Sequence, residues 1–178
     1  MKSTLFIFIL ILISSVHVLG QKSDNYSFVK LYVTNEKNQV LLVKWEGEWE
    51  IAGSRYNDPV SVRQFANKIA EDMGIKVEDV KLCGLFTQKW QGNNNATIMH
   101  YYKAKYKGGT LKIPSDCTDI KWFSFDEAMK VIPYPIMTSM MMQINKNPEK
   151  VIGAAFERYR DKNNVSHHRV IEDFYVMN

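Results

Sequence analysis

Two adjacent carboxylates, Glu71 and Asp72, stand near the end of an amphipathic segment, where they could bind a cation together. Carboxylate oxygens are ligands that Mg²⁺ and Mn²⁺ take in proteins, and such an ion can activate water for attack on phosphorus. The carbonyl group of Gly53, in the turn before this segment, could supply a further oxygen. We therefore assign Glu71 and Asp72 as candidate catalytic residues, and the same two residues with Gly53 as candidate metal ligands.

Lys68 lies one helical turn before the two acids. Residues three and four apart are neighbours on a helix, so Lys68 is expected to form ion pairs with Glu71 and Asp72. These ion pairs would occupy the two carboxylates without any ligand. The same ammonium could instead contact phosphate oxygens, which makes Lys68 the candidate substrate-binding residue. Acids elsewhere could rebuild a metal site, and the candidates are Glu48, Glu50, Asp116 and Asp119.

The segment from Asp58 to Gly74 is expected to present these side chains on a helix. Asp58 is a favourable N-cap, and Pro59 suits the first helical position, where its missing N–H has no partner to lose. Apolar residues recur at steps of three and four, namely Val62, Phe65, Ala66, Ile69 and Met73. Gly74 then ends the helix as the residue after the C-cap.

Strands and further helices surround this helix in the sequence. Strands are expected at four β-rich runs, residues 27–34, 39–45, 80–90 and 96–107, and the first two form a hairpin. A strand at 120–123 leads into a helix capped at Ser124, and the run IMTSMMMQI predicts a helix packed on the sheet. A further helix is expected at 149–160, followed by a polar tail. This order predicts an α+β protein, an α/β/α sandwich with a mixed β-sheet.

The W-x-x-A-G turn, the helix ending E-D-x-G-I and the later K-W-F-S-F-D-E-A together resemble a Nudix hydrolase domain over residues 26–146. The box of that family runs Gly, five residues, Glu, seven residues, Arg-Glu, an aliphatic residue, any residue, Glu-Glu, any residue, Gly and an aliphatic residue. It aligns without a gap from Gly53 to Ile75, with Ile69 at the aliphatic position. Residues 53–75 are therefore identified as a degenerate Nudix box.

The resemblance implies a Nudix-like fold and hydrolysis of nucleoside diphosphates linked to another group, with Mg²⁺ or Mn²⁺ as cofactor. Pro59 and Lys68 stand where the box has glutamates, and Asn67 replaces its arginine. At an effective dielectric near 20, an ammonium roughly 4 Å from a divalent ion costs several kcal/mol. We therefore expect a degraded metal site with weak or absent activity. The alternative is a non-catalytic module on a Nudix fold that binds a small phosphate-containing ligand or a protein.

Residues 1–20 have the pattern of a secretory signal peptide, with an apolar run from Leu5 to Ile13 and small residues up to Gly20. The run is too short for a spanning helix, which takes about 20 residues, and an uncleaved anchor is the alternative. We divide the chain into a signal peptide (1–20), a Nudix-like domain (21–146) and a C-terminal helix with a polar tail (147–178). The protein is expected to be secreted or periplasmic after cleavage near Gly20, without a stable membrane anchor.

Cysteine content and net charge indicate which cross-links and which binding partners to expect. Cys83 and Cys117 could form a disulfide in an exported protein, and two separate buried thiols are the alternative. The net charge of +4 falls to +3 without the lysine of the leader, and no dense basic block occurs, so no nucleic-acid partner is expected. The oligomeric state has no signal in the sequence.

Other residues that could stack on a ligand or bind a metal have a simpler interpretation. Four aromatic residues could stack a nucleobase, but packing in the core or on the sheet is the favoured reading for Trp45, Trp49, Trp90 and Tyr101. His167 and His168 are adjacent in the polar tail, and neighbouring side chains point apart, which makes them a poor metal pair. A small exported α+β protein of unrelated role, whose helix matches the box by chance, is the third hypothesis.

Overall fold

The computed structural model describes residues 27–93 and 95–178, so the leader lies outside the described residues. In chain order the elements are β1 (Ser27–Thr34), β2 (Val40–Trp45), β3 (Glu48–Glu50), β4 (Gly53–Arg55), α2 (Val62–Asp72), β5 (Ile75–Trp90), β6 (Ala96–Gly109), β7 (Cys117–Phe123), α3 (Phe125–Val131), α4 (Pro135–Lys146), β8 (Ile152–Arg160) and β9 (Ser166–Val176).

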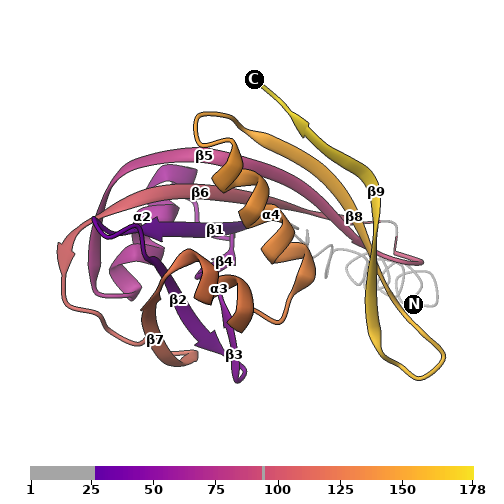
Figure 1. Cartoon of the computed structure of the whole chain (residues 1–178), viewed down its shortest axis with the longest axis horizontal. Coiled ribbons are helices and arrows are strands. Elements are labelled where there is room, and N and C mark those ends of the chain that lie inside the picture. Colours follow the sequence, from indigo (N-terminus) through magenta and orange to yellow (C-terminus); the bar gives the residue numbers. More distant parts are fainter. Residues whose placement is uncertain (1–26, 94) are drawn as a thin grey trace, which may run out of the picture.

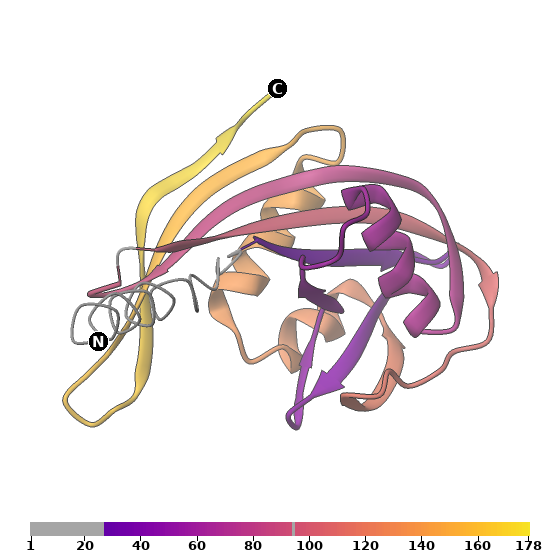
Figure 2. The same cartoon turned by 180° about the vertical axis from the view of Figure 1, so that it is seen from behind.

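The strands of the described residues form one mixed sheet in the order β3-β2-β1-β6-β5-β8-β9, with β4 paired to β1 and β7 to β2. β1 runs parallel to β6 and β5 runs parallel to β8, whereas the other pairs are antiparallel. Figure 1 shows α3 and α4 on one face of the sheet, and Figure 2 shows α2 on the other. The predicted α+β architecture, a mixed sheet between layers of helices, is confirmed.

Side chains of β1 alternate between two cores because successive residues of a strand point to opposite faces of the sheet. Val29, Leu31 and Val33 pack beneath α2, together with Phe65 and Ile69 of that helix. Tyr32 belongs to the other core, where Phe86, Tyr101 and Phe156 pack with buried methionines of α4, namely Met137, Met140 and Met141. Burying each large apolar side chain stabilises the fold by about 1.5–3 kcal/mol. The same alternation places Lys30 on the face that α4 covers.

Helix α2 begins later than the sequence predicts. Ser61, rather than Asp58, is the N-cap: its hydroxyl accepts the N–H of Gln64 at 3.2 Å, and the Gln64 side chain accepts the N–H of Ser61 at 2.9 Å. This reciprocal capping box satisfies two N–H groups that the first turn leaves free. Asp58 instead forms an ion pair with Lys68. Gly74 follows the C-cap with φ +73°, which confirms its predicted role in ending the helix.

The other elements before residue 147 follow the sequence closely. Helix α3 is capped by Ser124 in a capping box with Glu127, and α4 covers the methionine run, as predicted. β1 and β2 are antiparallel, as expected, but they meet only at Thr34 and Val40, and most of β2 pairs with β7. No helix among the described residues is both long enough and apolar enough to cross a membrane.

The prediction of a helix at 149–160 and a polar tail is wrong. Residues Ile152–Arg160 form β8, which pairs with β5, and Ser166–Val176 form β9, which completes an edge of the sheet (Figure 1). A short buried apolar run fits a strand as well as a helix, so periodicity alone cannot distinguish the two. Gly153 shows why a strand fits: a Cβ there would lie 2.5 Å from the Tyr175 ring, which crosses this point from β9.

Candidate functional site

Two adjoining cavities lie along β1 and share part of their lining. The first, the aromatic cavity, has a volume of about 590 Å³, and its walls include Trp45, Trp90, Tyr101, Tyr134 and Arg158. The second, the turn cavity, has about 580 Å³, and its walls include Gly53, Asp72, Asp116 and Cys117. The residues common to both are Phe28, Lys30, Trp45 and Glu50. Lys30 and Glu50 therefore lie at the boundary of the two cavities.

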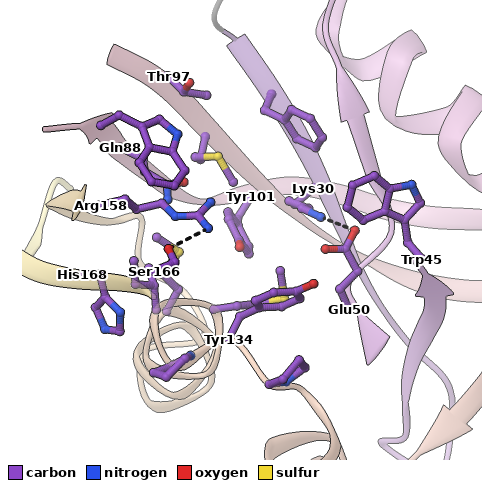
Figure 3. Close-up of a pocket in the computed structure, with 18 of the residues that line it drawn as sticks. Lys30, Trp45, Glu50, Gln88, Thr97, Tyr101, Tyr134, Arg158, Ser166 and His168 are labelled. Atoms are coloured by element: carbon purple, nitrogen blue, oxygen red, sulfur yellow. Dashed lines mark hydrogen bonds and ion pairs between the residues drawn. The ribbon is translucent and has the colours of Figure 1, made fainter. Parts of the chain in front are cut away.

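Lys30 and Glu50 form a buried ion pair at this boundary (Figure 3). The Lys30 Nζ lies 2.9 Å from Glu50 Oε1 and 2.9 Å from the carbonyl oxygen of Ile51, and the two side chains are 5% and 15% exposed. An ammonium has three donors, and these two contacts use two of them. The same Nζ lies over the Phe28 ring, 5.3 Å from its centroid, and its third N–H has no hydrogen-bond acceptor among the described residues. Sequence reasoning considered Glu50 only as a spare acid and overlooked Lys30.

Gly53 is required by close packing against this lysine. Gly53 of β4 is the register partner of Lys30 in β1. A Cβ at Gly53 would lie 2.5 Å from Lys30 Cδ and 2.5 Å from the carbonyl oxygen of Val29, closer than side chains can pack. The glycine that begins the degenerate box lines the turn cavity, with a lysine side chain against it.

Lys68 does not pair with the two acids of the box. Its Nζ lies 2.6 Å from Asp58 Oδ2, an exposed contact that joins α2 to the turn before it. The hydrogen bond from Lys68 to Asp58 is the main cause that raises the pKa of Lys68. Neither Lys68 nor Glu71 lines the two cavities, whereas Asp72 lines the turn cavity. Lys68 thus forms its ion pair with Asp58 and not with Glu71 or Asp72 as expected, whereas its role as a substrate contact stays a prediction.

The side chains around Gly53 do not form a ready set of carboxylate ligands in the part of the chain that the structure describes. Within residues 27–93 and 95–178, no three His, Cys, Asp or Glu side chains lie together so as to hold a metal ion. Glu71 is exposed outside the cavities, and the carboxylate of Glu50 is bound to Lys30. Mg²⁺ keeps octahedral geometry and draws on carboxylates for charge as well as for oxygen atoms. Of the acids weighed as replacements, Asp116 lines the turn cavity with Asp72, but the buried ammonium of Lys30 lies in the same wall.

Cys83 and Cys117 are both free thiols in the structure, so the disulfide considered from the sequence is not formed. Cys83 belongs to the core beneath α3 and α4, and Cys117 packs against the core beneath α2, on the other face of the sheet. Burial raises the pKa of Cys83 to about 12, and burial with the neighbouring Asp116 carboxylate raises that of Cys117 to about 12. Both thiols are therefore protonated at neutral pH.

The four aromatic residues divide between packing and cavity lining. Trp49 packs edge-on against Phe123, with ring centroids 4.9 Å apart, as the packing interpretation predicts. Tyr101 is buried against Phe86 and also reaches the floor of the aromatic cavity. Trp45 and Trp90 are 36% and 37% exposed and line that cavity, so the packing interpretation is wrong for them.

The C-terminal hairpin forms one wall of the aromatic cavity. Arg158 of β8 and Trp90 of β5 are register partners, and the guanidinium carbon lies 4.4 Å from the centroid of the indole ring. Ser166 and His168 of β9 line the same cavity (Figure 3). His168, placed in a solvated tail by the sequence, is half-buried, and burial followed by Arg158 lowers its pKa. These residues were missed because their segment was predicted to be a helix and a tail.

No protein-family model and no curated protein sequence matches the chain. Among solved structures, a MutT protein from Bacillus halodurans is similar with a TM-score of 0.63 and 16% identity, over 82% of this chain and 97% of that chain. A Nudix hydrolase from Nitrosomonas europaea has a TM-score of 0.60 and 13% identity, over 74% and 78%. The Nudix domain of NrtR from Shewanella oneidensis, complexed with ADP ribose, has a TM-score of 0.59 and 13% identity, over 76% and 96%. The fold that the degenerate box predicted is thereby confirmed, and this protein has the fold of the Nudix hydrolases.

Proposed function

We propose that this protein binds a small phosphate-containing ligand on its Nudix fold without a divalent cation and without appreciable hydrolysis. The observation that carries the proposal is the buried Lys30 ammonium at the boundary of the two cavities. The ammonium is shared with Glu50, so what it can offer a diphosphate is one directed, charge-assisted hydrogen bond. The metal site of the degenerate box is then dispensable for binding, although an ion that activates water would be needed for the family's hydrolysis.

The surroundings of Lys30 favour a strong contact with an anion. Phe28, Trp45 and Tyr134 line the aromatic cavity around the Lys30–Glu50 pair, and apolar walls lower the local dielectric constant. Hydrogen bonds between charged partners contribute more than neutral ones, at about 1.5–3 kcal/mol each. The fold itself is compatible with such a ligand, since the similar NrtR domain binds ADP ribose.

Isothermal titration of the purified protein with ADP-ribose, ADP and pyrophosphate tests the proposal, in EDTA and in Mg²⁺. We expect equal affinity under both conditions and no product. The double variant Lys30→Met/Glu50→Gln removes the ammonium without stranding a buried carboxylate, and it is expected to weaken binding roughly 10- to 100-fold. The control, Asp72→Asn, is expected to bind like the wild type. Binding that requires Mg²⁺ or the Asp72 carboxylate contradicts the proposal.

Hydrolysis of a diphosphate linked to another group is the second candidate function. It is favoured by Asp72 and Gly53 of the box and by Asp116 outside it, which line the turn cavity and could supply oxygen ligands. Mg²⁺ or Mn²⁺ would be its cofactor. Turnover of ADP-ribose that rises with Mn²⁺ and disappears in Asp72→Asn supports this function, and its absence leaves binding as the activity of the fold.

We also propose that the protein is exported. The order of a lysine, an apolar run and small residues in positions 1–20 supports this proposal. The N-terminal sequence of the protein recovered after expression in a secreting host tests it. A new terminus near Gln21 is expected, whereas an intact Met1 on cell-associated protein contradicts cleavage.

A further inference from the structure

The aromatic cavity contains a second cationic side chain, supplied by the C-terminal hairpin. Arg158 is half-buried and stacks on Trp90. Its hydrogen bond to the Ser166 hydroxyl is long, at 3.5 Å. Among the described residues, no carboxylate forms an ion pair with Arg158. Figure 3 shows its guanidinium reaching into the cavity from the hairpin side, while Lys30 and Glu50 meet on the other side.

Two other arginines of the same hairpin, Arg169 and Arg160, have partners within the protein. Arg169, on the opposite face, forms an ion pair with Glu157, which Lys89 also approaches at 3.3 Å. Arg160 donates to the carbonyl oxygen of Asn164 at 2.9 Å. A charged group withdrawn from water is costly unless it is paired, and burial lowers the pKa of Arg158 accordingly. Arg160 is exposed, whereas Arg158 is half-buried without a carboxylate partner in the described part of the chain, and an anionic ligand would supply one.

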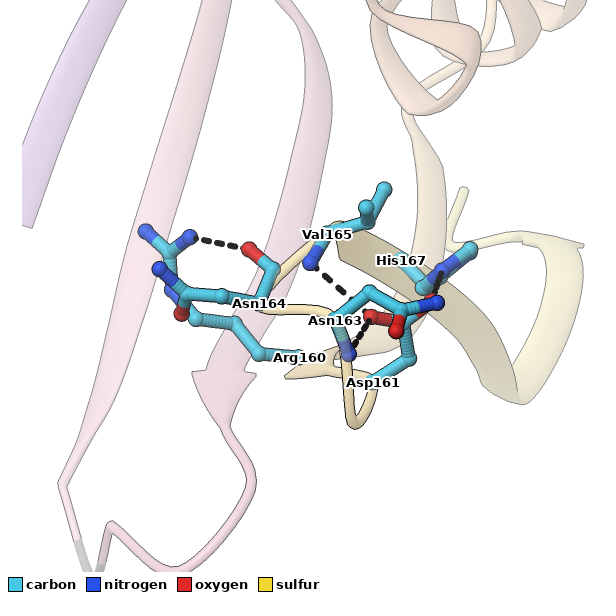
Figure 4. Close-up of polar contacts among 6 residues, drawn as sticks. All are labelled: Arg160, Asp161, Asn163, Asn164, Val165 and His167. Carbon is cyan, nitrogen blue, oxygen red and sulfur yellow. Dashed lines mark hydrogen bonds and ion pairs between the residues drawn. The ribbon is translucent and has the colours of Figure 1, made fainter.

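Polar contacts of Asp161 hold the turn of the hairpin (Figure 4). One carboxylate oxygen of Asp161 accepts the N–H groups of Asn163 at 2.8 Å and Val165 at 2.9 Å. The other lies 3.0 Å from Nε2 of His167. These contacts hold the start of β9 in register with β8, so that His168 is directly opposite Arg158. The site is thus organised before a ligand arrives, which reduces the entropy cost of binding.

We propose that Arg158, Ser166 and His168 form a second anion-binding point in the aromatic cavity, and that it takes a terminal phosphate monoester of the ligand. Three side chains with hydrogen-bonding groups match the three terminal oxygens of a phosphate monoester, and the planar guanidinium can bind two of them at once. This inference rests on the proposed function. It specifies that the ligand carries phosphate at two places, one for Lys30 and one for Arg158, with the ring of Trp90 available beside the second.

A matched pair of ligands tests the second point: ADP-ribose, and ADP-ribose that carries an additional 2′-phosphate. The full protein is titrated with each in EDTA. We expect the phosphorylated ligand to bind roughly 10- to 100-fold more tightly, the effect of one charge-assisted set of hydrogen bonds. Arg158→Met is expected to remove this preference, and Arg158→Lys to retain part of it because the charge remains but the fork is lost.

The control variant is Lys162→Met, which removes one positive charge from the exposed turn of the same hairpin. It is expected to keep the full preference, and thermal unfolding checks that all variants are folded. Equal affinity of the wild type for the two ligands overturns the second anion point while leaving the proposed function intact, as does a preference that persists in Arg158→Met. If neither ligand binds the folded wild type, the proposed function and this inference both fail.

Discussion

Replacing Lys30 with methionine is expected to destabilise the fold strongly, because it strands a buried carboxylate. The two charges are 2.9 Å apart, which at an effective dielectric of 20 corresponds to an attraction of about 6 kcal/mol before the cost of desolvation. Desolvation of both groups offsets much of this attraction. What remains after Lys30→Met is an unpaired Glu50 and a carbonyl oxygen of Ile51 without its donor. Breaking such a pair from one side costs about 3 kcal/mol or more, which predicts a fall in Tm of roughly 6–12 °C.

Urea unfolding of four proteins measures this effect: the wild type, Lys30→Met, Glu50→Gln, and the double variant. Because the double variant leaves no buried charge, we expect it to be more stable than Lys30→Met. The free energies of unfolding of the single variants should therefore not add, and the difference gives the coupling between the two side chains. Similar m-values across the set would show that the unfolding transition is the same.

The reasoning is refuted if Lys30→Met loses less than about 1 kcal/mol and the two substitutions are additive. That result would mean that both groups are hydrated in solution. It would also remove the basis for Lys30 as a fixed cation in the ligand site.

Three further predictions concern groups around the cavities. Lys68→Glu is expected to produce no tight Mn²⁺ binding in calorimetry, because Lys68 contacts Asp58 and lies outside the cavities. A high-affinity Mn²⁺ site in this variant would contradict this position of Lys68. Cys83 and Cys117 are expected to resist a thiol reagent at pH 8, because both pKa values are raised to about 12. Both should react fully after unfolding without reductant. Fewer than two reactive thiols per unfolded chain would indicate a disulfide. The pKa of Asp161 is lowered, first by the hydrogen bond with His167, so its stabilisation of the hairpin is complete above the ordinary value of 3.8 and is lost as pH falls below it. The protection factors of β9 amides, which are corrected for the intrinsic pH dependence of exchange, should therefore fall on acidification in the wild type and should be low at every pH in Asp161→Asn.

The box region was predictable because its signals are local. The apolar stripe of α2, the glycine after it and the spacing from Gly53 to Asp72 all lie within about one helix and one turn, and the structure places both residues in one cavity. The start of the helix was displaced because Asp58 and Ser61 are both good caps, and sequence alone does not show that Asp58 binds Lys68 instead.

The rest of the site depends on pairings that no local pattern encodes. A single lysine in the run F-V-K-L-Y-V is typical of the solvent face of a strand, and only the approach of β4 and Glu50 makes Lys30 an interior group. Trp90 and Arg158 meet through parallel pairing of β5 with β8, strands that α3 and α4 separate in the chain. A parallel partner of this kind is set by the tertiary fold, so neither the hairpin nor its cation could be anticipated.

The two strands after α4 form a wall of the aromatic cavity that is separate from the box helix. Arg158, Ser166 and His168 face the aromatic cavity, whereas the helix that carries the box packs on the opposite side of the sheet. Selectivity for a ligand can thus diverge through substitutions in the last thirty or so residues while the box helix stays as it is. A chain shortened before β8 would keep the box but lose that selectivity, and it would leave the edge of β5 open to pairing with other molecules.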